Sequence, residues 1–278
     1  MSRAERQYHR QYCDTQDKDM KLVTFNIRCD FDQDGPNSFR YRKEIILEKI
    51  RREAPDILCF QEVLPHVAIW LKENLSDYYV IGCGRDEKLL DEQTSIAYKK
   101  TVFNLMQMDV FWLSETPNVP GSRYENQSVC PRVCTMALFQ NLETREVFRI
   151  YNTHLDHIGS EARRAGLSQI LERIASEEAF VSAPVILTGD FNAFPGSEEL
   201  KVLENYPELV DLTEGITGTY HEFGTLEEPE KIDYIIVSDT ISCSLSVTWE
   251  DCKNGVYLSD HYPVCVEIQF KQKVSEGF

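Results

Sequence analysis

The sequence predicts a mixed α/β fold in which parallel and antiparallel strands occur in one domain. Residues 21–63 read as strand, helix, strand, and a crossover of this kind joins parallel strands. The middle third instead contains β-rich runs separated by short turns, which is typical of antiparallel meanders. With 278 residues, 42% of them hydrophobic, the chain can bury one substantial core.

The first half of the chain supplies the crossover and the meander. KLVTFNIRC, residues 21–29, is the first predicted strand, and DILCFQEV, residues 56–63, is the second. Between them, Ile46 and Ile50 recur at helical spacing until Pro55 ends the helix. Four further runs are predicted as strands: TSIAYKK, TVFNLMQMDVFWLS, RVCTMALFQNL and REVFRIYNTHL.

The second half returns to alternating helices and strands. GSEARRAGLSQILERIASEE is a predicted helix, because Ala162, Ile170 and Ile174 mark one apolar side. The long irregular stretch 213–231 is expected to be a loop near a site. The remaining predicted elements are the strand APVILTGDFN (183–192), a short helix near 197–205, and the strands KIDYIIVS (231–238) and HYPVCVEIQF (261–270).

The composition excludes secreted and membrane proteins. The first 19 residues contain no apolar core of a secretory signal, and no later run supplies the roughly 20 apolar residues of a membrane span. The nine cysteines are odd in number and lie mostly in apolar runs, as reduced thiols do. We therefore expect a cytoplasmic protein without a membrane partner: a polar arm at 1–19, one domain over 20–272 and a short tail at 273–278.

The net charge limits the partners. The chain carries 46 acidic and 29 basic residues, a formal charge of −17. Proteins bind nucleic acid largely by neutralising phosphates with Lys and Arg, so a nucleic-acid partner is possible but not favoured. Acids that converge on a divalent metal would instead attract an anionic substrate. The charge alone does not decide between these cases.

Polar side chains end several of the predicted apolar strands. A buried strand should not finish in such residues unless they have partners or a task. Asp190 and Asn192 are two apart and so project to one face, where Gly189 permits close backbone approach. The set comprises Asn26, Glu62, His154, Asp190, Asn192, Asp233, Asp260 and His261.

These residues lie in six ordered motifs: LVTFNIR, ILCFQEV, YNTHLDH, LTGDFN, IDYIIVS and LSDHYPV. Each motif alone is weak, but together they resemble the endonuclease/exonuclease/phosphatase superfamily, also called deoxyribonuclease I-like, over residues 21–270. The segments RCDFDQDGPNSFRYRKE, FWLSETPNVPGSR and HLDHIGSEARRAG further resemble stand-alone, mostly bacterial members and, more distantly, the deadenylase branch. The resemblance implies a four-layer α/β/β/α sandwich of two mixed β-sheets flanked by helices.

The resemblance also implies a metal-dependent phosphoesterase. Glu62 would be the principal ligand of Mg²⁺ or Mn²⁺, with Asn26 and Asp260 helping directly or through water, since such ions require hard oxygen ligands. The remaining roles concern the reaction itself: Asp190 would orient and deprotonate the attacking water, Asn192 would hold that water or a phosphate oxygen, His154 and His261 would donate to the phosphate oxygens, and Asp233 would orient His261.

Three further residues are candidates for substrate binding. Arg132 and Arg163 are placed to contact a substrate phosphate, although either could instead pair with a surface acid, and Asp156 is similarly ambiguous. By contrast, His157 and His221 have no motif context and are interpreted as surface or core groups.

The expected reaction is in-line attack of water on a phosphodiester or phosphomonoester. A small soluble phosphate ester or a short oligonucleotide is favoured over a long duplex or a lipid, because the sequence contains no basic run or membrane-docking segment. A nuclease or deadenylase-like exonuclease is one alternative, and a non-catalytic binding module on the same fold is the other. The oligomeric state cannot be read from the sequence.

Overall fold

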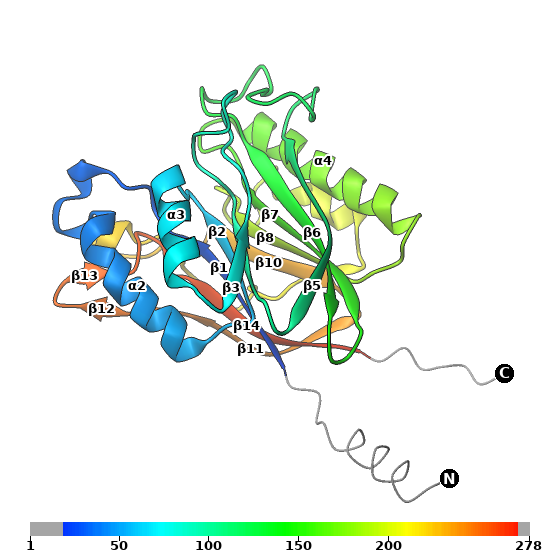
Figure 1. Cartoon of the computed structure of the whole chain (residues 1–278). Coiled ribbons are helices and arrows are strands. Elements are labelled where there is room, and N and C mark those ends of the chain that lie inside the picture. The colour runs from blue at the N-terminus through cyan, green and yellow to red at the C-terminus, as the bar shows by residue number, and fades with distance from the viewer. Residues whose placement is uncertain (1–18, 272–278) are drawn as a thin grey trace, which may run out of the picture.

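Two six-stranded β-sheets pack against each other, and helices cover their outer faces (Figure 1). The computed structural model describes residues 19–271. This architecture confirms the predicted α/β/β/α sandwich of two mixed sheets. The predicted arm, apart from Asp19, and the predicted tail at 273–278 lie outside the described residues.

The first sheet has the strand order β11-β14-β1-β2-β4-β3. As predicted, β1 and β2 are parallel and are joined through the helix α2 (Phe39–Glu53), whereas the other neighbours are antiparallel. The strands are β1 (Met20–Asn26), β2 (Ile57–Gln61), β3 (Tyr78–Ile81), β4 (Ile96–Lys99), β11 (Ile241–Thr248) and β14 (Val264–Phe270).

The second sheet has the order β5-β6-β7-β8-β10-β9. Its first three strands form the predicted antiparallel meander, and β7 and β8 are parallel across the helix α4 (Ser160–Glu178). The strands are β5 (Phe103–Trp112), β6 (Val133–Asn141), β7 (Val147–His154), β8 (Val185–Asp190), β9 (Leu209–Asp211) and β10 (Asp233–Ser238).

Several smaller elements were not expected from the sequence. The helix α3 (Pro65–Asn74) and the strands β3, β9 and β11 have no clear pattern in the sequence. By contrast, a helix was expected near 197–205, and the structure has the 3-10 helix η2 (Leu200–Asn205) there. The remaining elements are the 3-10 helices η1 (Asp32–Asn37) and η3 (Glu222–Gly224) and the ribbon of β12 (Cys252–Lys253) and β13 (Val256–Tyr257). Among residues 19–271, no helix is both long and apolar enough to cross a bilayer.

The hydrophobic core lies in three layers. Side chains such as Leu22 and Phe139 fill the space between the sheets. Helices α2 and α3 cover the outer face of the first sheet, and α4 covers the second with Leu167 and Ile170 (Figure 1). Burial of each such side chain contributes about 1.5 to 3 kcal/mol. The sheets therefore form a rigid base for the loops at their edges.

A buried amide pair connects the two sheets. Gln61, at the end of β2, donates from Nε2 to Oδ1 of Asn152 in β7 at 2.7 Å. Asn152 in turn donates from Nδ2 to the carbonyls of Phe60 and Ser95 at 2.8 and 3.0 Å. Both side chains are fully buried, so these bonds have no competition from water and fix the position of one sheet relative to the other.

A buried arginine connects the N-terminal and C-terminal parts of the first sheet. Arg42 of α2 donates from Nη1 to the carbonyls of Ile27 and Leu258 at 2.6 and 2.9 Å, and from Nη2 to that of Arg28 at 3.2 Å. Burial lowers the pKa of Arg42 to about 10, so the guanidinium stays protonated at neutral pH. It thereby holds together the segments that follow Asn26 and precede Asp260.

Gly189 allows strands β7 and β8 to approach closely at their carboxyl ends. Its φ of +148° is rarely adopted by other residues, and an added Cβ would lie 1.9 Å from the carbonyl oxygen of Thr153. In this register His154 pairs with Asp190. The glycine therefore places two candidate site residues side by side.

Replacing Gly189 with Ala is expected to lower the free energy of unfolding by about 2 to 4 kcal/mol, because the new methyl group forces the strands apart in an unfavourable backbone conformation. Chemical denaturation monitored by circular dichroism measures the change. Gly215→Ala is the control, since a Cβ there meets nothing within 4 Å. Equal stability of the two variants would contradict this account of Gly189.

Replacing Arg42 with Met is expected to lower the free energy of unfolding by about 3 to 5 kcal/mol, because buried carbonyls lose their only charged donor. Thermal and urea denaturation test the effect, with Arg40→Met as the control because Arg40 is an exposed residue of the same helix. A change of less than 1 kcal/mol would mean that water replaces the guanidinium at no cost.

Candidate active site

An open cavity of about 550 Å³ lies where the carboxyl ends of the central strands meet. Residues from both sheets reach it, because β1 and β2 end beside β7 and β8. The predicted site residues that line this cavity are Glu62, His154, Asp190, Asn192, Asp260 and His261, together with Arg132 and Arg163. Asn26 and Asp233 contact these residues from beneath.

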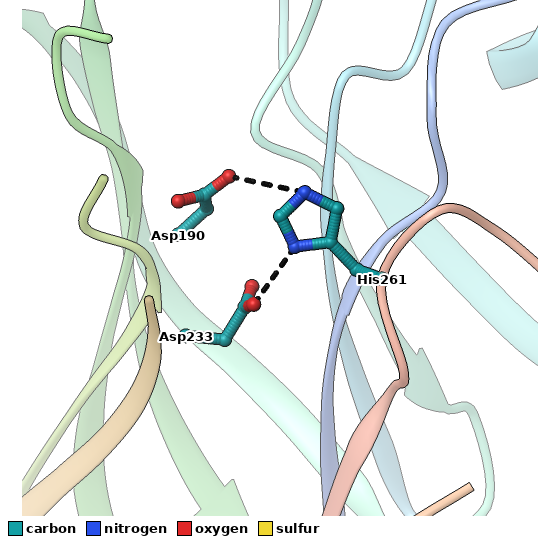
Figure 2. A group of neighbouring side chains, drawn as sticks. All are labelled: Asp190, Asp233 and His261. Carbon is teal, nitrogen blue, oxygen red and sulfur yellow. Dashed lines mark hydrogen bonds and ion pairs between the residues drawn. The ribbon is translucent and has the colours of Figure 1, made fainter. Parts of the chain in front are cut away.

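His261 lies between two aspartates (Figure 2). Its Nδ1 is 2.8 Å from Oδ2 of Asp233, and its Nε2 is 3.8 Å from Oδ2 of Asp190. Burial alone would lower the pKa of His261, but the charge and hydrogen bond of Asp233, followed by the charge of Asp190, raise it to about 10. The imidazole is therefore protonated at neutral pH and presents an N–H toward Asp190 and the cavity.

Asp190 is a buried carboxylate with several donors. It accepts hydrogen bonds from Asn26 Nδ2 at 3.0 Å and from the backbone N–H of Asn192 at 2.9 Å. Burial, reinforced by the neighbouring charge of Asp233, raises its pKa to about 7. A carboxylate of this pKa accepts a proton near neutral pH, as a general base requires.

Two further acids of the cavity, Glu62 and Asp260, come from segments next to strands of the first sheet. Glu62 accepts hydrogen bonds from Asn26 Nδ2 at 3.0 Å and from the N–H of Cys29 at 2.8 Å. Although burial opposes it, these bonds lower the pKa of Glu62. Asp260 forms an ion pair with Arg28 Nη1 at 3.2 Å, while burial, with the charge of Glu62, raises its pKa. The negative charge of Glu62 therefore disfavours ionisation of Asp260.

This pair of carboxylates fits a divalent cation. Hard ions take oxygen ligands, and a cation between Glu62 and Asp260 would relieve their repulsion. Asp190, Asp233 and His261 also bring one ligand atom each within 4.8 Å, but Nδ1 of His261 is already bonded to Asp233. The assignment of the cation to Glu62 and Asp260 stays a prediction. Asn26 turns its amide N–H groups toward Glu62 and Asp190 rather than its oxygen.

His154 and Asn192 complete the wall of the cavity around Asp190. Nε2 of His154 is 3.5 Å from Oδ2 of Asp190, and burial, together with the charges of Arg132 and Arg85, holds the pKa of His154 well below its usual value. His154 is thus a neutral imidazole. Asn192 has a φ of +48° and donates from Nδ2 to the carbonyl of Leu155 at 3.1 Å, which fixes its side chain at the cavity wall.

The three residues predicted to bind substrate differ in position. Asp156 is buried, does not line the cavity, and uses its carboxylate to accept from Ser128 and from the N–H of Gly159 at 2.7 Å, so it braces a loop instead of facing a substrate. Arg163 lines the cavity but pairs with Glu199 at 2.7 Å. Arg132 is buried at the cavity wall.

Sequence reasoning missed three cationic or imidazole groups of the cavity, Arg28, Arg85 and His157. Arg28 lies inside the LVTFNIR motif, two residues after Asn26, and this spacing was the available signal. His157 was interpreted as a surface or core group and is indeed exposed, but it also lines the cavity, with its Nδ1 2.8 Å from Nη2 of Arg132. Arg85 lies in a loop without any recognisable pattern.

Comparisons with known proteins agree with this geometry. A sequence model of the Endonuclease/Exonuclease/phosphatase family matches residues 23–261. An uncharacterized protein of Acanthamoeba polyphaga mimivirus is 25% identical over 267 residues, which cover 89% of this chain and 99% of that protein.

Two solved structures share the fold at higher identity. The endonuclease/exonuclease/phosphatase from Bacteroides vulgatus is 32% identical with a TM-score of 0.85, covering 91% of this chain and 99% of the other. The mannosyl-6-phosphatase from Bacteroides thetaiotaomicron is 29% identical with a TM-score of 0.83, covering 90% and 100%. Since the family match extends over most of the chain, the chain belongs to the endonuclease/exonuclease/phosphatase family.

Proposed function

We propose that this protein hydrolyses a small soluble phosphate ester with the help of a divalent cation, Mg²⁺ or Mn²⁺. The observation that carries the proposal is the environment of Asp190, a buried carboxylate with a raised pKa that lies between two imidazoles and two asparagines. A binding module would have no use for a matched base and donor set of this kind, and the burial of so many ionisable groups is costly.

In the proposed reaction Asp190 orients a water molecule and takes its proton as the water oxygen attacks phosphorus. The new P–O bond forms in line with the ester P–O bond, which breaks as the alcohol oxygen departs with its electron pair. Asn192, fixed at the wall of the cavity, holds the water or a phosphate oxygen. Asn26, bonded to both Asp190 and Glu62, fixes the direction of the base.

The two histidines stabilise the charge that develops on the phosphate oxygens. His261 is a cation aligned by Asp233, so its Nε2–H is directed without rearrangement at the moment of reaction. His154 contributes a neutral imidazole whose Nε2 lies 3.5 Å from Oδ2 of Asp190, the same oxygen that His261 faces. Asp233 is a positioning residue, because it acts through His261.

Glu62 and Asp260 would hold the cation, with Asn26 beside them. Bound there, a divalent cation supplies positive charge to the phosphate and to the departing oxygen. Arg28 balances the charge of Asp260 in its absence through the 3.2 Å ion pair. The similarity to a mannosyl-6-phosphatase supports a small phosphate ester as substrate, and the net charge of −17 counts against long nucleic acid.

Replacing Asp190 with Asn is expected to lower kcat by about 100- to 10,000-fold, because the amide keeps the shape of the carboxylate but accepts no proton from water. Initial rates on p-nitrophenyl phosphate and bis-(p-nitrophenyl) phosphate measure the loss. Asp239→Asn, at an exposed position, is the control and should retain full activity. A folded Asp190→Asn variant with normal turnover would rule out Asp190 as the base.

Removal of divalent cations is expected to abolish turnover, and addition of Mg²⁺ or Mn²⁺ should restore it. Because Glu62 supplies one of two ligand charges, Glu62→Gln should raise the half-saturating metal concentration by more than about 10-fold. Metal titrations of activity and isothermal titration calorimetry with the metal alone test both statements. Full activity in the presence of a chelator would disprove the metal requirement.

A further inference from the structure

Arg132 is a buried cation that its neighbours do not satisfy. The residue is 4% exposed, and neither Nε nor Nη1 has a hydrogen-bond partner among the described residues. Within residues 19–271 its guanidinium makes one hydrogen bond, from Nη2 to Nδ1 of His157. An uncompensated guanidinium in the interior costs several kcal/mol, so a protein rarely keeps one without a ligand for it.

The carboxylate of Asp156 does not accept a hydrogen bond from the unpartnered nitrogens of Arg132. Oδ1 of Asp156 is 3.7 Å from Nε of Arg132, which is too long for a hydrogen bond. The same carboxylate already accepts from the backbone N–H groups of Ser128, Ile158 and Gly159 and from the Ser128 hydroxyl. The Asp156 carboxylate therefore uses its hydrogen-bonding capacity within its own loop.

A second arginine, Arg85, adds positive charge beside Arg132, although the charge of Glu92 acts on both arginines. Arg85 pairs with Asp91 at 3.1 Å and with Glu92 at 2.6 Å. Burial, followed by the charge of Arg85, lowers the pKa of Arg132, and the two arginines depress the pKa of His154. The wall formed by Arg85, Arg132 and His154 thus places two cations and a neutral imidazole beside the carboxylates of Glu62 and Glu92.

This wall borders the position where the proposed substrate binds. Arg132, His154 and Glu62 line the open cavity and also a small cavity of about 10 Å³, which has room for one water-sized group. A phosphate group that contacts Asp190 and His154 would therefore direct one of its oxygens toward the guanidinium of Arg132.

We propose that Arg132 selects phosphomonoesters by binding the third terminal oxygen of the substrate phosphate. The inference rests on the proposed function and narrows it. A monoester is close to a dianion at neutral pH and has three terminal oxygens, whereas a diester carries one charge and has an alkoxy group in place of the third. The planar fork of arginine matches two phosphate oxygens, and its unsatisfied donors gain most from the more highly charged ester.

The test compares two substrates that differ in one oxygen substituent, p-nitrophenyl phosphate and methyl p-nitrophenyl phosphate. The wild type with Mg²⁺ or Mn²⁺ is expected to prefer the monoester. Arg132→Gln should lower kcat/KM for the monoester by about 10- to 100-fold and change that for the diester by less than about 3-fold. Arg132→Lys keeps the charge but lacks the fork and should lie between. Arg164→Gln, which removes an exposed arginine of α4, should match the wild type.

Binding of inorganic phosphate gives a readout that does not depend on turnover. Phosphate should raise the melting temperature of the wild type and of Arg164→Gln but not that of Arg132→Gln. Without phosphate, Arg132→Gln should be at least as stable as the wild type, because it removes a buried charge with two unpartnered nitrogens.

Three results would overturn the proposal: wild-type preference for the diester, an equal loss of both activities in Arg132→Gln, or unchanged phosphate binding in that variant. Failure of both Arg132→Gln and Arg132→Lys to fold would overturn it as well, since Arg132 would then be structural. If the wild type hydrolyses neither ester, the proposed function fails, and the phosphate titration alone decides whether Arg132 binds the anion.

Discussion

The hydrogen bond between Gln61 and Asn152 sets the geometry on which the site depends. Glu62 and Asn26 extend from the first sheet, whereas His154 and Asp190 extend from the second, so their separation is the separation of the sheets. Hydrophobic side chains between the sheets hold them together but do not define a unique offset, because apolar contacts are not directional. The directional amide pair, one residue from Glu62 and two from His154, supplies that definition.

The same cavity contains a cluster of acids and a pair of arginines. Asp190, Asp233 and Asp260 are buried acids and Glu62 is half-buried, and their mutual repulsion would favour a cation among them. On the neighbouring wall Arg132 and Arg85 bring two cations together, and the unpartnered nitrogens of Arg132 would favour an anion. A phosphate ester paired with a divalent cation satisfies both sides at once, and the arrangement sacrifices stability in the unliganded protein to do so.

Much of the fold and the site could be predicted from the sequence, for specific reasons. Asp190 and His261 were recognisable because polar residues at the ends of apolar strands stand out against a periodic background. The helix α3 was missed because its ten residues lack a clear apolar stripe, and β9 is too short to show alternation. Arg85 lies in an irregular loop, and the role of Asp156 depends on contacts made after folding, which no local pattern records.

The carbonyls that Arg42 gathers come from opposite ends of the sequence. Ile27 is among the first residues of the described chain and Leu258 among the last, and β14, which pairs with β1, follows Leu258. Asp260 and His261 therefore reach the cavity only when the C-terminal strand has docked beside the N-terminal one. During synthesis the cavity remains incomplete until the segment through β14 has left the ribosome, so a nascent chain that ends before Leu258 lacks part of the cavity.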